Sequence, residues 1–502
     1  MFFLFLLVAM PVLAAPVDIL TVKYDTDRTG ANLRESILNT KNVNEKSFGK
    51  VAAFPVDGQI YAQPLFVSGI EVGGKIRNVV YVATMSNSVY AFDADSADAV
   101  LLWHVNVGEA APSYLYGFRD INPSVGILST PVIDRDTNTI YLVANVIEED
   151  RTLYRMHALD LRTGVERMQG PVEIRAELAG TGEGSENGRL VFQPFWHLQR
   201  PGLLLADGVV YVGFGSHGDD GPFHGWLIGY DAANLQRQAH VLCLSRDGAA
   251  ASIWQAGYGP AADASGQIYL VTGNGDLDGV SNFGQSVVRL NPQRGLAVDD
   301  WFSPDAWEYL NEEDQDFGSC GAVLIPGTNL LIAGGKDGNI YLLDRNSLGR
   351  TYPGNPGAVQ SFPAIGFGIY GMALWTRPDA AIVYVRAASG VLRAFALRGG
   401  RFVTDPIAER RSEPGVPYQG MAVSADGDDL ESGILWVASS DDVLHAYNAA
   451  DITQELWNSD LRYERDELGT FSKFASPTVA NGKVYAPTFA NQLVVYGLLP
   501  AR

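Results

Sequence analysis

Two loops of this sequence gather side chains that could hold a metal ion. The stretch 215–226, GSHGDDGPFHGW, carries two histidines and two aspartates, namely His217, Asp219, Asp220 and His224. The stretch 272–279, TGNGDLDG, offers the Asn274 amide followed by two alternating aspartates. Carboxylate and amide oxygens suit a hard cation such as calcium, whereas a histidine pair suits a transition metal. No later Glu completes an EF-hand pattern, and Asp and Gly are also common in ordinary turns, so plain turns stay open as the alternative.

Two further segments carry side chains for proton transfer and for charge stabilisation. Asp316 lies in DQDFGSCGAVL, residues 314–324, and a carboxylate there could accept a proton from a substrate. Lys336 lies in GGKDGNIYLLDRNSLG, residues 334–349, and its ammonium could polarise a carbonyl group. The alternative for Lys336 is a solvated side chain in a tight turn, the ordinary fate of lysine. On the strand assignment below, these four loops lie at the same end of their strands, so we expect them to converge.

An internal repeat of about 50 to 70 residues organises the chain, and such a period is typical of repeat architectures. Each unit contains a short β-branched strand that usually ends in an aromatic residue. The eight copies are Val80-Tyr81, Ile140-Tyr141, Val210-Tyr211, Ile268-Tyr269, Leu331-Ile332, Val383-Tyr384, Leu435-Trp436 and Val484-Tyr485. A second apolar strand follows each of them, and in the first five units it ends in Asp93, Asp160, Asp231, Asn291 and Asp344. Alternation of period two bounded by turn residues favours strands over helices.

The repeat predicts an all-β fold, an eight-bladed β-propeller of four-stranded antiparallel blades. The last unit stops after three strands, so we expect residues 49–56, GKVAAFPV, to supply its outer strand and to close the ring. This places a single propeller over residues 44–500. The segment 15–43 precedes it as an N-terminal arm, and we expect residues 17–43 to lie on the surface.

The N-terminal residues 1–14 resemble a secretory signal peptide, an apolar run ending in small residues with cleavage expected after Ala14. A membrane anchor is the alternative, although roughly 15 apolar residues fall short of the ~20 that a helical span needs. No other segment could span a membrane. We therefore expect a secreted or periplasmic protein.

The composition narrows the classes of partner and cofactor. A net charge of −21 and a pI near 4.7 argue against a nucleic-acid partner, because phosphate backbones need a basic surface. The two cysteines, Cys243 and Cys320, fall in blades that are not neighbours, so we expect no disulfide between them. No CxxCH motif is present, so no covalently attached haem is expected.

The pattern VYVAT…VYAFDADS…LLW resembles the repeat of the quinoprotein family, the pyrroloquinoline-quinone alcohol dehydrogenases. The resemblance covers essentially the whole propeller and implies the eight-bladed fold. Trp103 and Trp457 take the positions of the family's girdle tryptophans, which dock adjacent blades. The same repeat also builds non-catalytic scaffolds, such as the outer-membrane assembly lipoprotein, so function has to be argued from the site.

The resemblance also implies roles for residues in the four loops. It assigns calcium ligation to Asp220, Asn274 and Asp316, and contact with the oxygens of the quinone to Lys336. Asp316 is in addition the position of the family's catalytic base. The segment around Lys336 is the closest match in the chain, whereas Asp220 stands where the family has Glu, and the Trp and Asn that flank the family's aspartate are absent near Asp316.

One departure from the family weighs against catalysis. The quinoprotein alcohol dehydrogenases carry adjacent cysteines in a disulfide that stacks on the quinone, and this chain has none. Its matching region, residues 109–127, contains Arg119, which could meet a carboxylate of the quinone. Trp254 is the nearest candidate for the family's floor tryptophan, and a place in the core is the alternative for it.

Two hypotheses follow from these observations. In the first, the protein is a calcium- and pyrroloquinoline-quinone-dependent dehydrogenase of alcohols or sugars, an oxidoreductase without haem that passes its electrons to a separate carrier. In the second, it is a non-catalytic propeller that binds a protein or a glycan. The missing cysteines favour the second hypothesis, and the four matched loops favour the first. A hydrolase or lyase that uses His217 or His224 is a third idea that no motif singles out.

Overall fold

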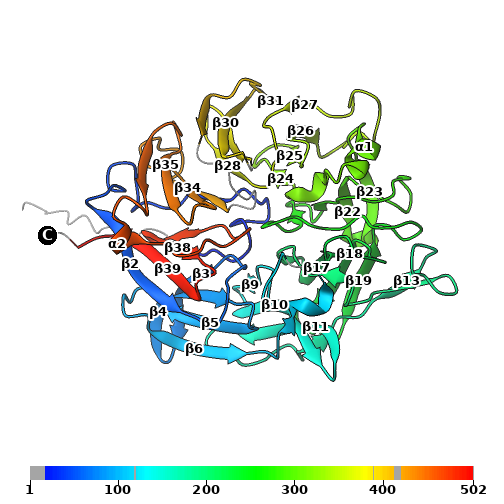
Figure 1. The fold of residues 1–502 in the computed structure, drawn as a ribbon, viewed down its shortest axis with the longest axis horizontal. Helices are drawn as coiled ribbons and strands as arrows, with labels where there is room; N and C mark the ends of the chain where they lie inside the picture. The colour runs from blue at the N-terminus through cyan, green and yellow to red at the C-terminus, as the bar shows by residue number, and fades with distance from the viewer. Residues whose placement is uncertain (1–16, 118–119, 388, 412–419, 501–502) are drawn as a thin grey trace, which may run out of the picture.

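The strands of the fold carry alternating apolar residues, and these residues pack one sheet against the next. The computed structural model describes residues 17–117, 120–387, 389–411 and 420–500. Within them eight antiparallel sheets surround a central axis (Figure 1). The predicted all-β, eight-bladed propeller is therefore confirmed. No helix among these residues is long and apolar enough to cross a membrane.

The first four blades are consecutive in the chain. Blade one comprises β3 (Leu65–Val72), β4 (Lys75–Ala83), β5 (Ser88–Asp93) and β6 (Leu101–Asn106). Blade two comprises β9 (Val132–Asp134), β10 (Thr139–Glu148), β11 (Arg151–Asp160) and β12 (Val172–Glu173). Blade three comprises β16 (Leu204–Ala206), β17 (Val209–Ser216), β18 (Trp226–Asp231) and β19 (Gln238–Cys243), with β15 (His197–Leu198) added beside β17. Blade four comprises β20 (Ala261–Ala262), β21 (Ile268–Val271), β22 (Val287–Asn291) and β23 (Ala297–Phe302).

The last four blades continue in the same order. Blade five comprises β24 (Val323–Leu324), β25 (Leu330–Gly334), β26 (Asn339–Asp344) and β27 (Gln360–Pro363). Blade six comprises β28 (Met372–Thr376), β29 (Ala381–Arg386), β30 (Val391–Arg398), β31 (Arg401–Phe402) and β32 (Ala408–Arg411). Blade seven comprises β33 (Met421–Ser424), β34 (Ile434–Ala438), β35 (Leu444–Asn448) and β36 (Glu455–Asn458). Blade eight comprises β37 (Thr478–Ala480), β38 (Lys483–Pro487), β39 (Gln492–Leu498) and β2 (Phe48–Pro55).

Short elements occupy the loops between the blades. The strands among them are β7 (Ala111–Pro112), β8 (Ser124–Val125), β13 (Glu177–Ala179) and β14 (Arg189–Val191). The helices are α1 (Trp307–Glu312), between blades four and five, and α2 (Tyr463–Asp466), between blades seven and eight. Three 3₁₀ turns cover Ser113–Tyr116, Pro292–Arg294 and Phe317–Ser319.

The ring closes through an exchanged strand, as the sequence predicts. β2 pairs antiparallel with β39 and forms the outer edge of blade eight, and Figure 1 shows the blue β2 beside the red β39. Trp457 at the end of blade seven packs against Phe48 of β2, with ring centroids 5.0 Å apart and nearly perpendicular planes. Pairing of this kind leaves no free sheet edge at the point where the two ends of the propeller meet.

The repeated aromatic residues dock each blade onto the next. The Tyr81 hydroxyl donates a hydrogen bond to Leu161 O at 2.9 Å, and that of Tyr141 donates to Ala232 O at 2.8 Å. Tyr384 makes the same bond to Ala449 O at 2.5 Å. Each acceptor directly follows the Asp or Asn that ends a third strand. The repeated tyrosine and the repeated Asp or Asn therefore act together in joining one blade to the next.

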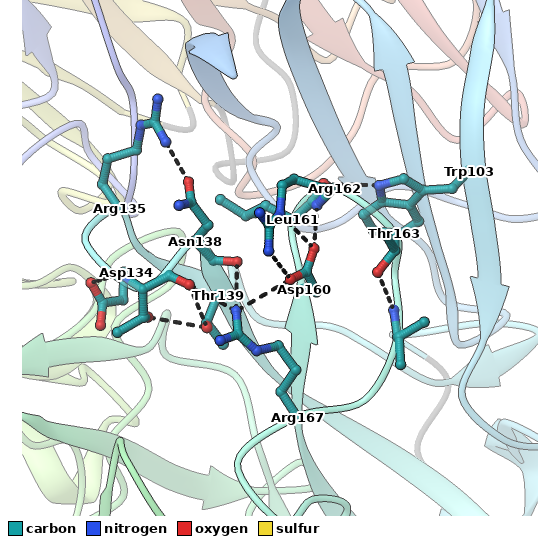
Figure 2. A network of polar contacts seen from close by, with 12 residues as sticks. Trp103, Asp134, Arg135, Asn138, Thr139, Asp160, Leu161, Arg162, Thr163 and Arg167 are labelled. Carbon is teal, nitrogen blue, oxygen red and sulfur yellow. Dashed lines mark hydrogen bonds and ion pairs between the residues drawn. The ribbon is translucent and has the colours of Figure 1, made fainter. Parts of the chain in front are cut away.

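A network at the first of these junctions shows how the loop that receives a docking residue is held (Figure 2). The Trp103 indole nitrogen donates to Leu161 O at 2.9 Å, which agrees with the predicted girdle position. Asp160, the residue before that acceptor, forms ion pairs with Arg162 at 2.9 Å and with Arg167 at 3.3 Å. The indole covers Gly164, where a Cβ would come within 2.7 Å of the ring. The carboxylate thus fixes the turn that presents the docking carbonyl.

The arm that precedes β2 is buried, so the expectation of a surface-lying segment is wrong for residues 17–36. Backbone hydrogen bonds join it to the innermost strands of six blades, through the pairs Ile19–Phe66, Leu20–Ile133, Thr26–Ala262, Asp27–Leu324, Thr29–Leu374 and Gly30–Val423. The Asn32 side chain adds a bond to Val479 in blade eight, and Arg28 reaches Leu203 beside β16. The backbone bonds of the arm therefore follow the order of these six blades along the edges that face the axis.

Candidate functional site

A cavity of about 340 Å³ opens where the blade-to-blade loops meet the loops between second and third strands. Its polar and aromatic lining comes from blades one to six and includes Asp120, Arg200, Asp219, Trp254, Asp314, Asp316, Lys336 and Tyr370. The volume lies within the range of small-molecule sites, roughly 300–1,000 Å³. Convergence of residues from so many loops in one cavity makes it the candidate site.

The structure brings some of the residues predicted from the sequence together and not others. Asp316, Lys336 and Trp254 line the same cavity. Asn274 lies directly behind its wall, because its backbone N–H donates to the Asp316 carboxylate at 3.0 Å. The 215–226 loop contributes Gly218 and Asp219 to the lining, and the predicted ligand Asp220 is not part of it. Arg119 lies outside the described residues.

Asp316 and Lys336 form the central ion pair of the cavity. The Lys336 ammonium lies 2.6 Å from Asp316 Oδ2 and 3.3 Å from Asp314 Oδ2. The Asp316 side chain is 6% exposed and that of Lys336 is 24% exposed, so solvent screens the pair only partly. Burial acts to lower the pKa of Lys336, but the carboxylates of Asp316 and Asp314 outweigh it and hold that pKa above its ordinary value. The lysine is therefore a fixed positive charge at the wall of the cavity.

A buried amide, which no sequence motif indicates, supports this pair from behind. Gln285 is fully buried, and its side-chain N–H₂ group donates to Asn274 Oδ1 at 2.7 Å. Its Oε1 accepts the backbone N–H of Phe317, the residue after Asp316, at 2.7 Å. The Asn274 amide in turn donates to Asp314 Oδ1 at 2.8 Å. Gln285 thus connects the loop of blade four to the loop that carries Asp316.

Arg200 and Trp254 make up another part of the wall. The guanidinium carbon of Arg200 lies 5.0 Å from the Trp254 ring centroid and 3.9 Å from that of Phe474. Stacking of this kind holds the arginine plane without removing its charge. The Trp254 indole nitrogen is buried and has no hydrogen-bond partner within the described part of the chain. The wall thus offers a cation and an aromatic surface.

The loop from blade one is tied across the axis to the loop before blade eight. Lys473 donates to Asp120 O at 2.9 Å and forms an ion pair with the Asp120 carboxylate. Asp120 is part of the cavity lining. The bond therefore fixes one side of the opening from a segment about 350 residues away in sequence, a separation that only ring closure can bridge.

Asp219 is the carboxylate with the most altered acidity in the lining. Burial, together with repulsion from the Asp316 carboxylate, raises the pKa of Asp219 to about 6. The Ser216 hydroxyl donates to its Oδ1 at 2.8 Å and opposes that shift. Near neutral pH the site therefore contains a carboxylate that can take up a proton when an anion binds, because additional negative charge raises the pKa of Asp219 further.

The two histidines of the 215–226 loop are packed as structural residues. Both ring nitrogens of His224 are engaged, at 2.8 Å from the Ser245 hydroxyl and 2.9 Å from Glu183 O. The His217 ring stacks on Tyr116 with centroids 3.9 Å apart. No group of three or more His, Cys, Asp or Glu side chains is placed to hold a metal ion in the described part of the chain. The arrangement therefore does not favour a histidine-based metal site.

Burial of His217 predicts a specific dependence of stability on pH. The side chain is 2% exposed, and burial lowers its pKa to about 4, against about 6.5 in an unfolded chain. Below pH 6.5 the unfolded chain binds a proton that the folded chain refuses, so stability falls as the pH falls. Between pH 7 and pH 5 this loss amounts to about 2 kcal/mol. In the variant His217→Phe, which keeps the stacking on Tyr116, the free energy of unfolding should fall by about 2 kcal/mol less over that range.

Urea titrations of both proteins at pH 7 and pH 5 measure this difference. The other titrating groups are common to the two proteins, so their contributions largely cancel. Parallel pH dependences in wild type and His217→Phe would contradict the assignment of a buried neutral imidazole.

The fold is similar to those of several solved propellers at low sequence identity. The quinohemoprotein alcohol dehydrogenase ADHIIG from Pseudomonas putida HK5 matches with a TM-score of 0.62 and 16% identity, over 97% of this chain and 81% of that one. A europium-containing methanol dehydrogenase matches with a TM-score of 0.65 and 13% identity, over 96% and 98% of the two chains. BamB from Moraxella catarrhalis matches with a TM-score of 0.52 and 14% identity, over 91% and 99%.

No protein-family model matches the sequence, and no curated protein matches it either. The structural similarities show an eight-bladed β-propeller fold that resembles the folds of these dehydrogenases and of BamB. Identities of 16% and below carry the fold alone. The chemistry therefore has to be argued from the cavity, because one propeller fold serves several functions.

Proposed function

We propose that the chain is a quinone-dependent dehydrogenase of alcohols or sugars, and that the cavity is its active site. The observation that carries the proposal is the Asp316–Lys336 pair, 2.6 Å apart, in one cavity with Trp254 and Arg200. The fold-level resemblance to quinoprotein dehydrogenases supports the class of cofactor.

The lining suits a planar, acidic quinone. Trp254 presents an aromatic surface, and Arg200 and Lys336 bring two positive charges. Asp219, with its pKa raised to about 6, can take up a proton when an anion binds and can then donate a hydrogen bond. A bound quinone would supply the two-electron acceptor for oxidation of the substrate.

The predicted calcium ligands do not fit calcium in this arrangement. Calcium takes about six to eight oxygen ligands. The Asn274 side-chain oxygen is bonded to Gln285, and Asp316 Oδ2 is bonded to Lys336. Asp220 is absent from the cavity lining. No step of the proposal therefore uses a metal ion.

In the proposed reaction, Asp316 Oδ2 receives the proton of the substrate carbinol. A bound quinone would accept the hydrogen that leaves the carbinol carbon with its electron pair, so that the alcohol would become a carbonyl compound. The Lys336 ammonium pairs with the Asp316 carboxylate at 2.6 Å and stabilises the negative charge that develops in the cavity. Trp254 and Arg200 orient the planar group and exclude water from one side. A separate carrier would be needed to take the two electrons onward.

The test is binding of pyrroloquinoline quinone to the purified protein, measured by equilibrium dialysis and absorbance. We expect retention of about one quinone per chain, lost in Lys336→Ala and in Trp254→Ala and kept in Lys41→Ala, whose side chain lies on the exposed surface. Retention would justify a screen of alcohols and sugars with an artificial electron acceptor. No retention at micromolar quinone would overturn the proposal and would leave a propeller that binds a protein or glycan, with which the fold is compatible.

Export forms part of the same proposal, since a periplasmic or secreted enzyme would meet its quinone and its electron carrier outside the cytoplasm. The apolar residues 1–14 support it, although they lie outside the described residues. N-terminal sequencing of the protein recovered from the periplasm or medium is the measurement. A mature chain that starts near Ala15 is expected, and recovery in the cytoplasm with Met1 retained would contradict export.

A further inference from the structure

We propose that this site is built around the Lys336 ammonium instead of a divalent cation, and that Gln285 enforces this by turning the Asn274 side-chain oxygen away from the cavity. The inference concerns the cavity to which the proposed function is assigned. The inference rests on the proposed function only for the meaning of the cavity as an active site. Its test does not, because Ca²⁺ binding is measured without quinone.

The direction of the Asn274 amide follows from a chain of hydrogen bonds that starts at a backbone N–H. A backbone N–H can only donate, so the group of Gln285 that faces Phe317 N at 2.7 Å must be the acceptor Oε1. The N–H₂ group of Gln285 then faces Asn274, and the atom of Asn274 that accepts from it at 2.7 Å must be oxygen. The N–H₂ group of Asn274 is left to face the cavity-lining Asp314, at 2.8 Å. If the side-chain amide of Gln285 or of Asn274 were reversed, N–H donors would face N–H donors and oxygen acceptors would face oxygen acceptors.

Gln285 itself has little freedom to change. It is fully buried, and its backbone N–H donates to Gly273 O at 2.7 Å. The Ser303 hydroxyl donates to its carbonyl at 2.8 Å. Its φ of +49° lies in the left-handed region, which a side-chain-bearing residue occupies only where its surroundings hold it there. The polarity of the chain of bonds is therefore built into the fold.

Lys336 takes up the oxygens that a cation would otherwise need. Its three N–H bonds match three acceptors: Asp316 Oδ2 at 2.6 Å, Asp314 O at 3.0 Å and Asp314 Oδ2 at 3.3 Å. Asp316 Oδ1 accepts the Asn274 backbone N–H at 3.0 Å. Asp219 has one oxygen bonded to Ser216, and Asp120 has one oxygen paired with Lys473, so each leaves one carboxylate oxygen beyond this network. Two such oxygens fall far short of the calcium shell of about six to eight.

The test is calorimetric titration of Ca²⁺ into protein stripped of metal by chelation. For the wild type we expect no binding tighter than about 1 mM, the weak end of protein calcium sites. In Gln285→Glu, a near-isosteric change, the carboxylate still accepts from Phe317 N, but its second oxygen now repels the Asn274 oxygen. The Asn274 amide should reverse and present its oxygen beside Asp314, so Ca²⁺ binding should tighten at least about tenfold.

A matched control distinguishes two effects of Gln285→Glu on Ca²⁺ binding: reversal of the Asn274 amide and the added negative charge. In the double variant Gln285→Glu with Asn274→Leu the gain should disappear if the Asn274 oxygen provides it. If Ca²⁺ binding stays tighter in the double variant, the added charge alone explains it, and the role given to Gln285 is overturned. Wild-type binding of one Ca²⁺ tighter than about 1 mM, lost in Asn274→Ala, would overturn the proposal even if Gln285→Glu fails to fold.

Quinone retention, measured with and without chelator, keeps this inference apart from the proposed function. Retention that is equal in both supports the inference. Retention that is lost on chelation and restored by Ca²⁺ overturns it while the proposed function stands. Absence of retention under both conditions counts against the proposed function alone, since the titrations decide the metal question by themselves.

Discussion

Replacing Asp316 with Asn is expected to lower turnover of the proposed alcohol or sugar oxidation by about 10²- to 10⁴-fold, the usual contribution of a positioned acid or base. The side chain keeps its shape, so its Oδ1 can still accept the Asn274 N–H. The atom facing Lys336 becomes an N–H₂ group that cannot take up a proton. Quinone retention should stay within a few fold, because Lys336, Arg200 and Trp254 remain in place.

The nearby carboxylate of Asp314 provides the control for the Asp316→Asn variant. Asp314 also faces Lys336, at 3.3 Å, but its side chain is 68% exposed against 6% for Asp316. Asp314→Asn should therefore lower turnover by less than about tenfold, as expected for a solvent-screened charge. Steady-state rates of both variants, at saturating quinone and substrate, measure the contrast. Equal losses in the two variants would show that Asp316 acts through charge alone and not as the base.

The propeller could be predicted because each blade repeats the same local physics. Val80-Tyr81 and its seven counterparts all fall in second strands, and the third strands end at the predicted acidic residues. A buried strand requires period-two apolar alternation, and the Tyr81 hydroxyl requires an acceptor on the next blade. Such requirements appear in the sequence as a repeat. The closing strand was predictable for the same reason, since blade eight has three strands of its own and lacks an outer one.

The candidate site could be predicted only in part, because its residues meet across loops of different blades. Asp316 and Lys336 lie in segments that resemble a known motif, and they do pair. The alignment placed the acidic ligand of the 215–226 loop at Asp220, yet Asp219 lines the cavity, with a φ of +62° that turns its side chain differently from an extended residue. A shift of one residue in a turn depends on backbone conformation, which spacing alone does not report.

Other residues carried no signal in the sequence because their roles depend on long-range contacts. Gln285 is a single amide in a strand-preceding stretch, and only its bonds to Asn274 and Phe317 reveal its role. Arg200 stacks on Phe474, more than 270 residues away in sequence. Lys473 meets Asp120 by closing across the ring. Polar residues of this kind look like solvated surface until the fold is known.

The N-terminal arm illustrates the same limit on a larger scale, and it holds the residue with the largest expected effect on stability. Arg28 is fully buried, where a charged side chain is found only with many partners. Its guanidinium donates to Pro260 O at 2.7 and 2.9 Å, to the Thr21 hydroxyl at 2.7 Å and to Val22 O at 2.9 Å. Burial lowers its pKa to about 10, opposed by the carboxylates of Asp25 and Asp27.

The variant Arg28→Met should lower the free energy of unfolding by about 3–5 kcal/mol, because several buried acceptors would lose their donor at once. Urea titration followed by tryptophan fluorescence measures the loss. Limited proteolysis should at the same time cut the arm in the variant and spare it in the wild type, since the arm bonds to the blades through backbone that Arg28 organises. Lys41→Met is the matched control: its ion pair with Glu431 joins side chains that are 75% and 68% exposed, so its loss should change stability by less than about 0.5 kcal/mol. If Arg28→Met is as stable as Lys41→Met, the arm contributes little to the closed ring, and its bonds to successive blades follow the fold instead of stabilising it.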